Sequence, residues 1–360
     1  MTRPVRAGID LQALRYNFSV ARKKAAGSRV MAVVKADAYG HGLVPVARAL
    51  GEADAFAVVS LDEAVQLRDA GIRQDILLLE GVFTEQELAA SMHYKLQLVV
   101  HCEEQLRWLA QLPADNRPVV WLKVDTGMHR LGFAPQAARA AWHQARQLAV
   151  VKDGHQLRWM SHLCCADDPA HAANDAQLAR FTELTGSGDV IRSMANSAAL
   201  LTRPDAVFEW VRPGIMLYGA SPLLSQVSTG VELRPVMSLQ SRLIAVQQRR
   251  KGEALGYGQT WVCPEDMPVG VAAIGYGDGY PRHAPSGTPV LVNGTLAPLV
   301  GRVSMDTICV DLRNRPQACA GDEVLLWGRG LAVETIAEYA GTISYELFCG
   351  VTPRVPRIYS

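Results

Sequence analysis

Short apolar runs alternate with amphipathic stretches through the first two-thirds of the chain, and no other feature constrains its fold as strongly. Most runs are rich in Val, Ile and Leu at consecutive positions, as parallel strands are when helices cover both faces of their sheet. The sequence predicts eight β/α units, with strands at Val30–Lys35, Ala55–Ser60, Asp75–Glu80, Leu96–His101, Val119–Asp125, Leu157–Leu163, Val190–Met194 and Phe208–Arg212.

Helical segments are predicted between these runs. Ser60 opens one with Ser-Leu-Asp-Glu, the spacing of a capping box, and Gly71 ends it. Thr84 opens a second, and Leu106–Leu112 and Ala134–Leu148 show the same helical pattern. Eight such units favour a (β/α)₈ barrel of the TIM type, while a doubly wound open sheet is the alternative.

The amino-acid composition changes after Pro222, where Gly and Pro become more frequent. Asn293-Gly294 between two apolar runs is a strong hairpin signal, and Leu331–Ala340 is a predicted helix. A chain of 360 residues is long enough for two cores. We therefore predict a barrel domain over residues 1–222 and a mostly β domain over residues 223–360, with strands at Ser238–Val246, Gly270–Ile274, Thr288–Val292, Thr307–Asp311 and Glu323–Leu326.

Charge and apolar content exclude several classes of protein. The chain has 36 basic and 35 acidic residues, without the basic excess typical of a nucleic-acid binder. No stretch approaches the ~20 apolar residues that span a bilayer, and no apolar run follows Arg3 and Arg6 as in a secretory signal. The seven cysteines are scattered and suggest neither disulfides nor a metal site. We expect a cytoplasmic protein that binds neither nucleic acid nor membrane.

Lys35 is the first candidate for catalysis. It stands at the end of the first apolar run, where barrel enzymes place catalytic groups, and a partly buried lysine can form a Schiff base. By position alone, it could equally be a lysine that marks a strand end. The surrounding Val-Val-Lys-Ala-Asp-Ala-Tyr-Gly-His-Gly, residues 33–42, decides between the two because it resembles the cofactor-lysine signature of the alanine racemase family.

The resemblance extends over essentially the whole chain and implies a (β/α)₈ barrel followed by a β domain. It implies an isomerase that interconverts L-alanine and D-alanine with pyridoxal 5′-phosphate, which Lys35 would bind covalently. Tyr39 and Ser197 would donate hydroxyls to the cofactor phosphate, together with the backbone amides of Gly214 and Ile215. Taken alone, the Asn-Ser-Ala segment that contains Ser197 is an ordinary helix cap.

Arg212 is the most informative residue for the mechanism. Most sites for this cofactor place a carboxylate beside the pyridine nitrogen, whereas the resemblance places Arg212 there. Arginine keeps its proton and can only donate, so the ring nitrogen would stay unprotonated. That state favours return of the proton at Cα, as racemisation requires. Without the resemblance, a surface salt bridge is an equally good interpretation of this arginine.

Racemisation removes a proton from one face of Cα and returns it on the other, so two bases are expected. Lys35 would serve one face. The resemblance assigns the other face to Tyr257, in Leu-Gly-Tyr-Gly, and places His162 between Tyr257 and Arg212. Taken separately, Tyr257 fits a turn tyrosine and His162 a core histidine.

The resemblance further implies a homodimer with shared active sites. Tyr257, Met305 and Asp306 would reach the pocket of the neighbouring subunit, where the last two border the substrate. Arg130 would bind the substrate carboxylate, since its planar fork suits that group. Lys123 would lie beside Arg130, and carbamylation would turn this second positive charge into a negative one.

An access corridor would be formed by Asp167, Tyr276, Arg282 and Arg302. The glycines around Tyr276 alone indicate turns, and no Gly-Lys-Ser/Thr follows that would mark a phosphate loop. Two positions depart from the family pattern. Ser193 stands where a histidine is common, and Pro353 stands where a gate tyrosine is common, which leaves open how broad the substrate range is.

Three other interpretations remain open. A decarboxylase of basic amino acids on the same architecture would need an acidic partner for the pyridine nitrogen, and Arg212 argues against it. A non-enzymatic pyridoxal-phosphate-binding barrel would not need the β domain with Tyr257 and Met305. A barrel enzyme without this cofactor would lack its visible absorbance. The residues do not indicate whether D-alanine would be made for the cell wall or degraded.

Overall fold

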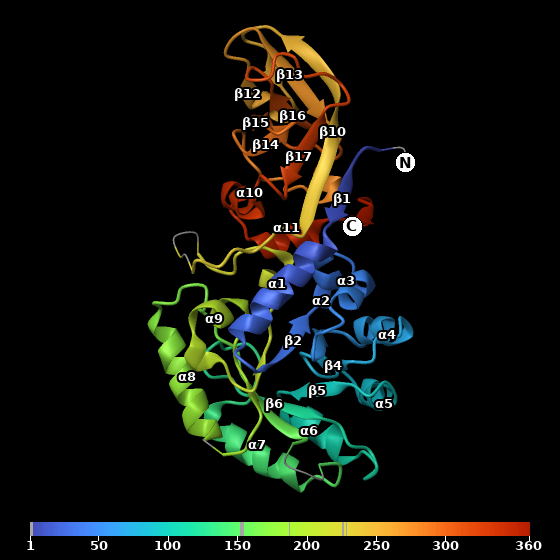
Figure 1. The fold of residues 1–360 in the computed structure, drawn as a ribbon, viewed down its shortest axis with the longest axis vertical. Helices are drawn as coiled ribbons and strands as arrows, with labels where there is room; N and C mark the ends of the chain where they lie inside the picture. The colour runs from blue at the N-terminus through green and yellow to red at the C-terminus, as the bar shows by residue number, and fades with distance from the viewer. Residues whose placement is uncertain (1–2, 152–154, 187, 225–226, 228) are drawn as a thin grey trace.

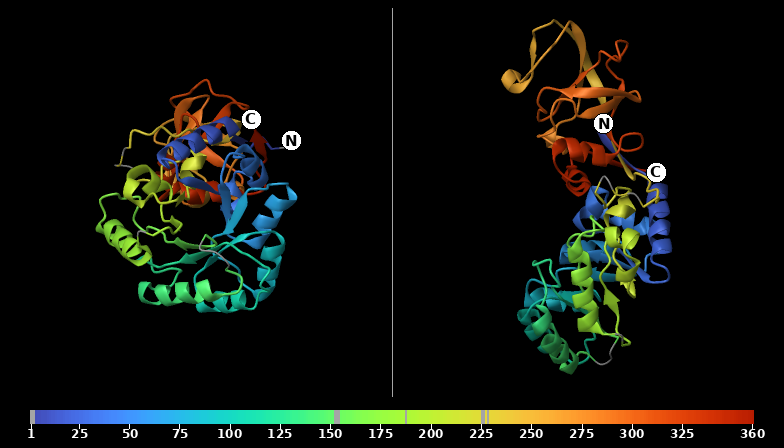
Figure 2. Two further views of the ribbon diagram at one scale, coloured as in Figure 1. Left: turned by 60° about the horizontal axis from the view of Figure 1, so that its bottom comes forward. Right: turned by 90° about the vertical axis from the view of Figure 1, so that its left-hand side faces the viewer.

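The structure, a computed structural model, describes residues 3–151, 155–186, 188–224, 227 and 229–360. The chain forms two bodies stacked along the long axis of the molecule, a helix-rich body below and a strand-rich body above (Figures 1 and 2). The C-terminal end of the chain lies where the two bodies meet. No described helix is at once long and apolar enough to cross a membrane.

The lower body is a closed barrel of eight parallel strands in chain order. It closes where the last strand pairs with the first, with Arg29 opposite Trp210 and Val30 opposite Val211. Closure confirms the barrel and excludes the open sheet. The strands are β2 (Arg29–Val33), β3 (Ala55–Val58), β4 (Asp75–Leu78), β5 (Gln97–Val100), β6 (Val120–Lys123), β7 (Leu157–Met160), β8 (Arg192–Ser193) and β9 (Trp210–Val211).

Helices surround the barrel strands (Figure 2). Both predicted caps are present, since the Ser60 hydroxyl accepts the Glu63 N–H at 3.2 Å and the Thr84 hydroxyl accepts the Glu87 N–H at 3.2 Å. The helices of this part are α1 (Leu11–Lys24), α2 (Lys35–Gly40), α3 (Leu43–Ala49), α4 (Leu61–Asp69), α5 (Glu85–His93), α6 (Glu103–Ala110), α7 (Pro135–Gln147), α8 (Ala172–Thr185) and α9 (Ser197–Thr202).

Large side chains fill the barrel interior. Trp121 on β6 and Trp210 on β9 come from strands that are not neighbours, yet their ring centroids are 6.1 Å apart in an edge-to-face contact. Both rings therefore point inward, and Arg158 stacks its guanidinium against both, at 5.2 and 5.7 Å. The barrel is packed rather than open, so a ligand can bind only at one of its ends.

The upper body is built on a mixed sheet of eight strands with the order β13-β16-β15-β14-β17-β10-β1-β18. The predicted hairpin is confirmed, because Val292 pairs with Thr295 and both turn residues, Asn293 and Gly294, have positive φ. The strands are β10 (Met237–Arg249), β13 (Met267–Ala272), β14 (Pro289–Val292), β15 (Thr295–Val300), β16 (Ile308–Asp311), β17 (Glu323–Trp327) and β18 (Arg357–Tyr359), with β11 (Ala254–Leu255) and β12 (Trp261–Val262) as a separate pair.

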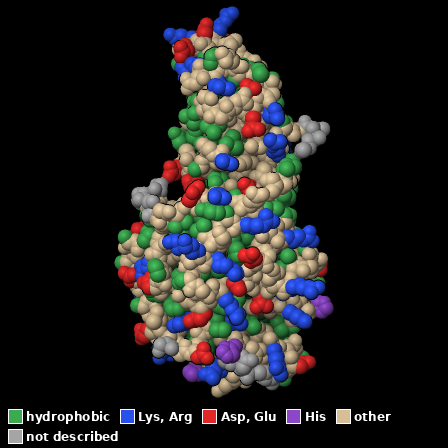
Figure 3. All heavy atoms as spheres, in the orientation of Figure 1, with side chains coloured by type: hydrophobic (Ala, Val, Ile, Leu, Met, Phe, Trp, Pro, Cys, Tyr) green, Lys and Arg blue, Asp and Glu red, His purple; other side chains and the backbone are tan. Residues whose placement is uncertain are grey.

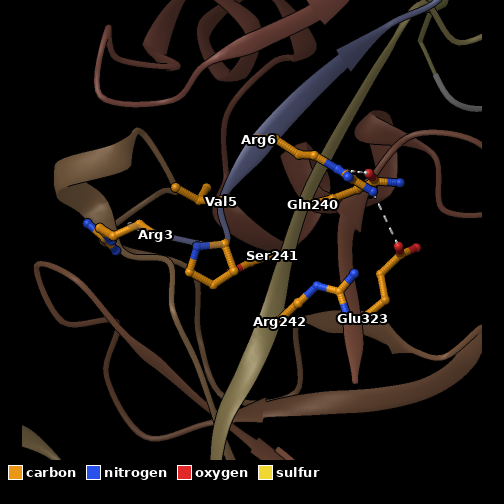
Figure 4. Close-up of a pocket in the computed structure, with 8 residues that line it drawn as sticks. Arg3, Val5, Arg6, Gln240, Ser241, Arg242 and Glu323 are labelled. Carbon is orange, nitrogen blue, oxygen red and sulfur yellow. Dashed lines mark hydrogen bonds and ion pairs between the residues drawn. The ribbon is translucent and has the colours of Figure 1, made fainter. Parts of the chain in front are cut away.

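Strand β1 (Arg6–Ile9), near the start of the chain, belongs to this upper sheet and not to the barrel, which the sequence did not indicate. It lies between β10 and β18. Figure 4 shows the Arg6 side chain beside Gln240 of β10, at 2.9 Å, and Glu323 of β17, at 3.7 Å. These residues line a cavity of about 250 Å³ in the upper body together with Arg3 and Arg242. The side chains of Arg6 and Arg3 are already ion-paired within the chain.

Two helices lie between β17 and β18 in the chain: α10 (Val333–Ala340), which was predicted, and α11 (Ser344–Gly350), which was not. Helix α11 packs on α2 at the barrel end, and the approach is close. A Cβ at Gly40, where φ is +74°, would lie 2.2 Å from the Phe348 carbonyl oxygen. Only glycine fits there, so Gly40 allows the upper body to cover the strand ends.

Acidic and basic side chains are interspersed over the face shown in Figure 3, as the near balance of the two charges suggests.

His41, six residues after Lys35, leads to a prediction of how the stability of the fold depends on pH. It is fully buried between Tyr218 and Phe348, and its Nδ1 donates to the Tyr39 carbonyl at 2.8 Å. Burial lowers the pKa of His41 to about 4. The unfolded chain therefore binds one more proton than the folded chain between about pH 6.5 and pH 4, so stability falls as pH falls through that window, by about 3 kcal/mol at its lower end.

Replacing His41 with phenylalanine should remove this part of the slope, as measured by urea unfolding at several pH values between 4 and 7. His143→Phe, at an exposed histidine, is the matched control and should leave the slope unchanged. Equal slopes in His41→Phe and the unsubstituted protein would refute the assignment.

Candidate active site

A cavity of about 360 Å³ lies at the C-terminal ends of the barrel strands. In a barrel this is the end that carries active sites. The cavity brings together nine of the residues singled out from the sequence: Lys35, Tyr39, Lys123, Arg130, His162, Ser197, Arg212, Gly214 and Ile215. Four of the lining residues are Lys or Arg and one, Glu80, is a carboxylate, so the cavity suits an anionic ligand.

The backbone after Lys35 is strained. Strand β2 ends at Val33, earlier than predicted, and residues 36–39 then form a left-handed turn with φ between 52° and 55°. Each such residue other than glycine costs about 1–2 kcal/mol, so surrounding contacts must hold the turn. The Glu63 carboxylate accepts the Ala36 N–H at 2.6 Å, and the Asp37 carboxylate accepts the Leu43 N–H at 2.7 Å. The turn brings the Tyr39 ring into the wall of the cavity.

Tyr39, Ser197 and Gly214 form one corner of the cavity. The Ser197 hydroxyl accepts the Gly214 N–H at 2.8 Å, and a Cβ at Gly214 would lie 2.4 Å from the Tyr39 hydroxyl oxygen. Glycine is therefore required for this close approach. Burial raises the pKa of Tyr39, so its hydroxyl stays protonated and can donate. The Met216 N–H, which was not predicted, lies 3.4 Å from the same Ser197 oxygen.

Arg212 is buried, and the partners recorded for its guanidinium are uncharged. One nitrogen donates to the Ser161 carbonyl at 2.7 Å and lies 3.3 Å from Nδ1 of His162, and the other donates to the Ser193 hydroxyl. Burial lowers the pKa of Arg212 to about 10, which still leaves it protonated at neutral pH. Ser193, one of the two departures from the family pattern, thus contacts Arg212 directly.

His162 is fixed in one protonation state by this contact. Burial, and next the positive charge of Arg212, hold its pKa well below the usual range, so the imidazole is neutral at neutral pH. Since arginine only donates, Nδ1 of His162 accepts and the proton of the ring resides on Nε2. His162 can therefore donate from Nε2 to a further group.

Lys123 lies among cations at the end of β6. Burial first, then Arg212 and Arg130, lower the pKa of Lys123 to about 8. A larger fraction of this amine is therefore neutral near pH 7 than for an exposed lysine. The Arg130 side chain is exposed at the cavity wall.

Some lining residues were not predicted. Glu80 could have been suspected, because it ends the fourth apolar run. Tyr345 and Cys349 come from α11, which no sequence signal placed over the barrel. Burial raises the pKa of Tyr345 to about 12.

The other predicted site residues lie outside this cavity. Tyr257, Tyr276, Met305, Asp306, Arg282 and Arg302 belong to the upper body and are exposed, the Tyr257 side chain by 68%. The Asp306 carboxylate is 2.6 Å from Arg354 and 3.3 Å from Arg3. Asp167 is exposed on the segment after β7, where its carbonyl accepts the Leu224 N–H at 3.1 Å. One chain alone does not bring these residues to Lys35.

Comparison with known proteins identifies the family of this chain. The model for the alanine racemase N-terminal domain matches residues 9–222, and that for the C-terminal domain matches residues 236–359. An alanine racemase of Nitrosococcus oceani is 53% identical over 97% of each chain, and one of Nitrosomonas europaea is 50% identical over 100% of this chain and 99% of the other. The crystal structure of a biosynthetic alanine racemase from Pseudomonas aeruginosa has a TM-score of 0.95 at 46% identity over all of both chains.

Proposed function

The chain belongs to the alanine racemase family, and from this premise we propose how its own residues interconvert L-alanine and D-alanine. The enzyme is an isomerase that depends on pyridoxal 5′-phosphate. The observation that supports this most directly is the pairing in one cavity of Lys35 with Arg212, a buried arginine whose recorded partners are neutral.

The residues of the cavity fit this cofactor. Lys35 supplies the amine that binds its aldehyde. The corner of Tyr39, Ser197 and Gly214, where only glycine can stand, offers hydroxyl and amide groups for the phosphate together with the Ile215 amide. The excess of cations balances the charge of a phosphate and a substrate carboxylate. When bound, the cofactor withdraws electrons from Cα of the amino acid and so acidifies its proton.

Two bases of this enzyme move that proton. Lys35 accepts or returns it on one face of Cα, and the Tyr257 hydroxyl does so on the other face. Arg212 would hold the pyridine nitrogen of the bound cofactor unprotonated, because arginine can only donate. His162, held by Arg212 through Nδ1, donates from Nε2 to the Tyr257 oxygen and stabilises it when it has lost its proton.

Tyr257 reaches the cavity from a second subunit. Its exposure on the upper body, along with that of Met305 and Asp306, supports a homodimer in which each upper body completes the neighbouring pocket. Met305 and Asp306 border the substrate, and Asp167, Tyr276, Arg282 and Arg302 line the corridor leading to it. The enzyme acts in the cytoplasm, either in making D-alanine for the cell wall or in its catabolism.

Lys123 should carry a carbamate. Its lowered pKa supplies the neutral amine that adds to carbon dioxide, with release of one proton. The product is an anion that pairs with Arg130 and orients it toward the substrate carboxylate. Native mass spectrometry in bicarbonate buffer should show the added mass of one carbon dioxide per chain, and Lys123→Met should lack it. Absence of the adduct from the unsubstituted protein, both by mass and by NMR with ¹³C-bicarbonate, would exclude it.

Chiral chromatography tests the function itself. The purified protein, incubated with pyridoxal 5′-phosphate, should approach a racemate at equal final ratios from L-alanine and from D-alanine. A cofactor-bound protein that racemises neither enantiomer but releases carbon dioxide from a basic amino acid would instead be a decarboxylase.

A further inference from the structure

Two adjacent thiols, Cys164 and Cys165, do not line the cavity and take no part in the reaction above. They follow β7, two residues after His162, and their Sγ atoms are 3.4 Å apart. Cys164 is exposed and Cys165 is half-buried. Their mutual hydrogen bond raises the pKa of Cys165, so this thiol is protonated at neutral pH.

The backbone of this pair is held by two buried side chains of α8. Gln177 accepts the Cys164 N–H at 2.9 Å, and Asn174 donates to the Cys165 carbonyl at 3.0 Å. Both side chains are almost completely inaccessible to solvent. The two thiols are therefore presented side by side on a fixed backbone, and little conformational entropy is lost when one ligand binds both.

The same glutamine connects the pair to the active site. The amide nitrogen of Gln177 donates to the His162 carbonyl at 3.0 Å, and lies 3.2 Å from the Thr126 hydroxyl, which contacts Ser161. The Ser161 carbonyl in turn accepts from Arg212. A change in the backbone at Cys164 would therefore act on the peptide that positions His162.

The geometry favours one class of ligand. A disulfide between adjacent residues is strained, because their Cα atoms are ~3.8 Å apart and disulfides usually need ~4.4 Å or more. Among the described residues, no three His, Cys, Asp or Glu side chains could hold a metal ion together. With a disulfide and a metal site of three or more such ligands excluded, the pair suits a soft, sulfur-binding element that is held by two sulfur ligands alone.

We propose that Cys164 and Cys165 form a dithiol site for trivalent arsenic compounds, and that occupation of this site inhibits the enzyme. An aryl arsenoxide would form two As–S bonds as two S–H bonds break, and both protons would leave with the arsenic-bound oxygen as water. No electrons are exchanged. The binding claim stands without the proposed function, whereas the inhibition claim rests on it.

Phenylarsine oxide is the probe. The holoenzyme is incubated with it in excess 2-mercaptoethanol, passed through gel filtration, and examined by native mass spectrometry. One phenylarsenic group per chain should be retained and should be removed by 2,3-dimercaptopropanol. Cys164→Ala and Cys165→Ala should each weaken retention by about tenfold or more, because the second thiol acts at a high effective concentration. Cys319→Ala, at a single exposed cysteine, is the matched control and should retain the adduct.

Cys349→Ala should also retain the adduct, although Cys349 lines the cavity. Racemase activity should fall in proportion to occupancy and recover with the dithiol. Equal retention in Cys164→Ala, or no adduct on the unsubstituted protein, would overturn the site. If every chain of an active racemase carries the phenylarsenic group and its activity is unchanged, the inhibition claim is wrong and the binding claim still holds. A protein that binds the arsenical through these two cysteines but racemises nothing would overturn the proposed function alone.

Discussion

Lys35→Ala should lose racemase activity by about 10⁴-fold or more in kcat, because this change removes both the amine that holds the cofactor and one of the two bases. The variant should fold, since Lys35 lies at the edge of the cavity and not in the apolar core. Chiral chromatography of the product in both directions gives the rate, and gel filtration shows whether the cofactor stays with the protein.

Lys24→Ala, at an exposed lysine near the end of α1, is the matched control and should keep full activity and cofactor. Substantial racemisation by a properly folded Lys35→Ala enzyme would mean that another amine serves, and Lys123 would then be the next lysine to replace.

Tyr257→Phe should lower kcat by about 10²–10⁴-fold, the range expected when one positioned proton-transfer group is removed. A rate alone would not separate a base from a residue that only shapes the pocket, so we would also follow deuterium uptake in D₂O. Lys35 still serves one face of Cα in this variant. One enantiomer should therefore exchange its Cα proton with solvent while the other does not, and racemisation should be nearly absent.

Tyr339→Phe is the matched control, because Tyr339 on α10 is also exposed, by 49%. It should leave both rate and exchange unchanged. Loss of exchange from both enantiomers in Tyr257→Phe would indicate a structural role for the tyrosine, and unchanged racemisation would show that the second base is another group.

The barrel could be predicted because its strands lie in apolar runs, several of which are followed by helix signals. Strands β8 and β9 have only two residues each, yet longer apolar segments around them revealed their positions. Strand β1 and helix α11 were missed for a common reason. Both are short, and tertiary contacts stabilise them more than local pattern does: Arg6 of β1 pairs with Gln240, 234 residues later, and α11 contacts α2 through Gly40.

Site residues were predicted where they belong to a motif of the family. They were missed where their role depends only on which residues the fold brings close together. Glu63 illustrates this limit. Its sequence position indicates a helix cap, but its carboxylate also accepts the Ala36 N–H and so supports the left-handed turn after Lys35. Nothing in Ala-Asp-Ala-Tyr, a segment without glycine, signals positive φ at four successive residues. Only contacts made in the folded chain impose that conformation.

The position of β1 has a consequence for how the protein is made. The barrel is encoded between β1 and β10, so a ribosome completes all eight barrel strands before it reaches the first of the later partners of β1. Barrel folding can then proceed on the nascent chain, domain by domain. The sheet is completed later still, because β18, which pairs with the other edge of β1, is the last strand in chain order. Until that moment β1 has an unpaired edge that another nascent chain could occupy.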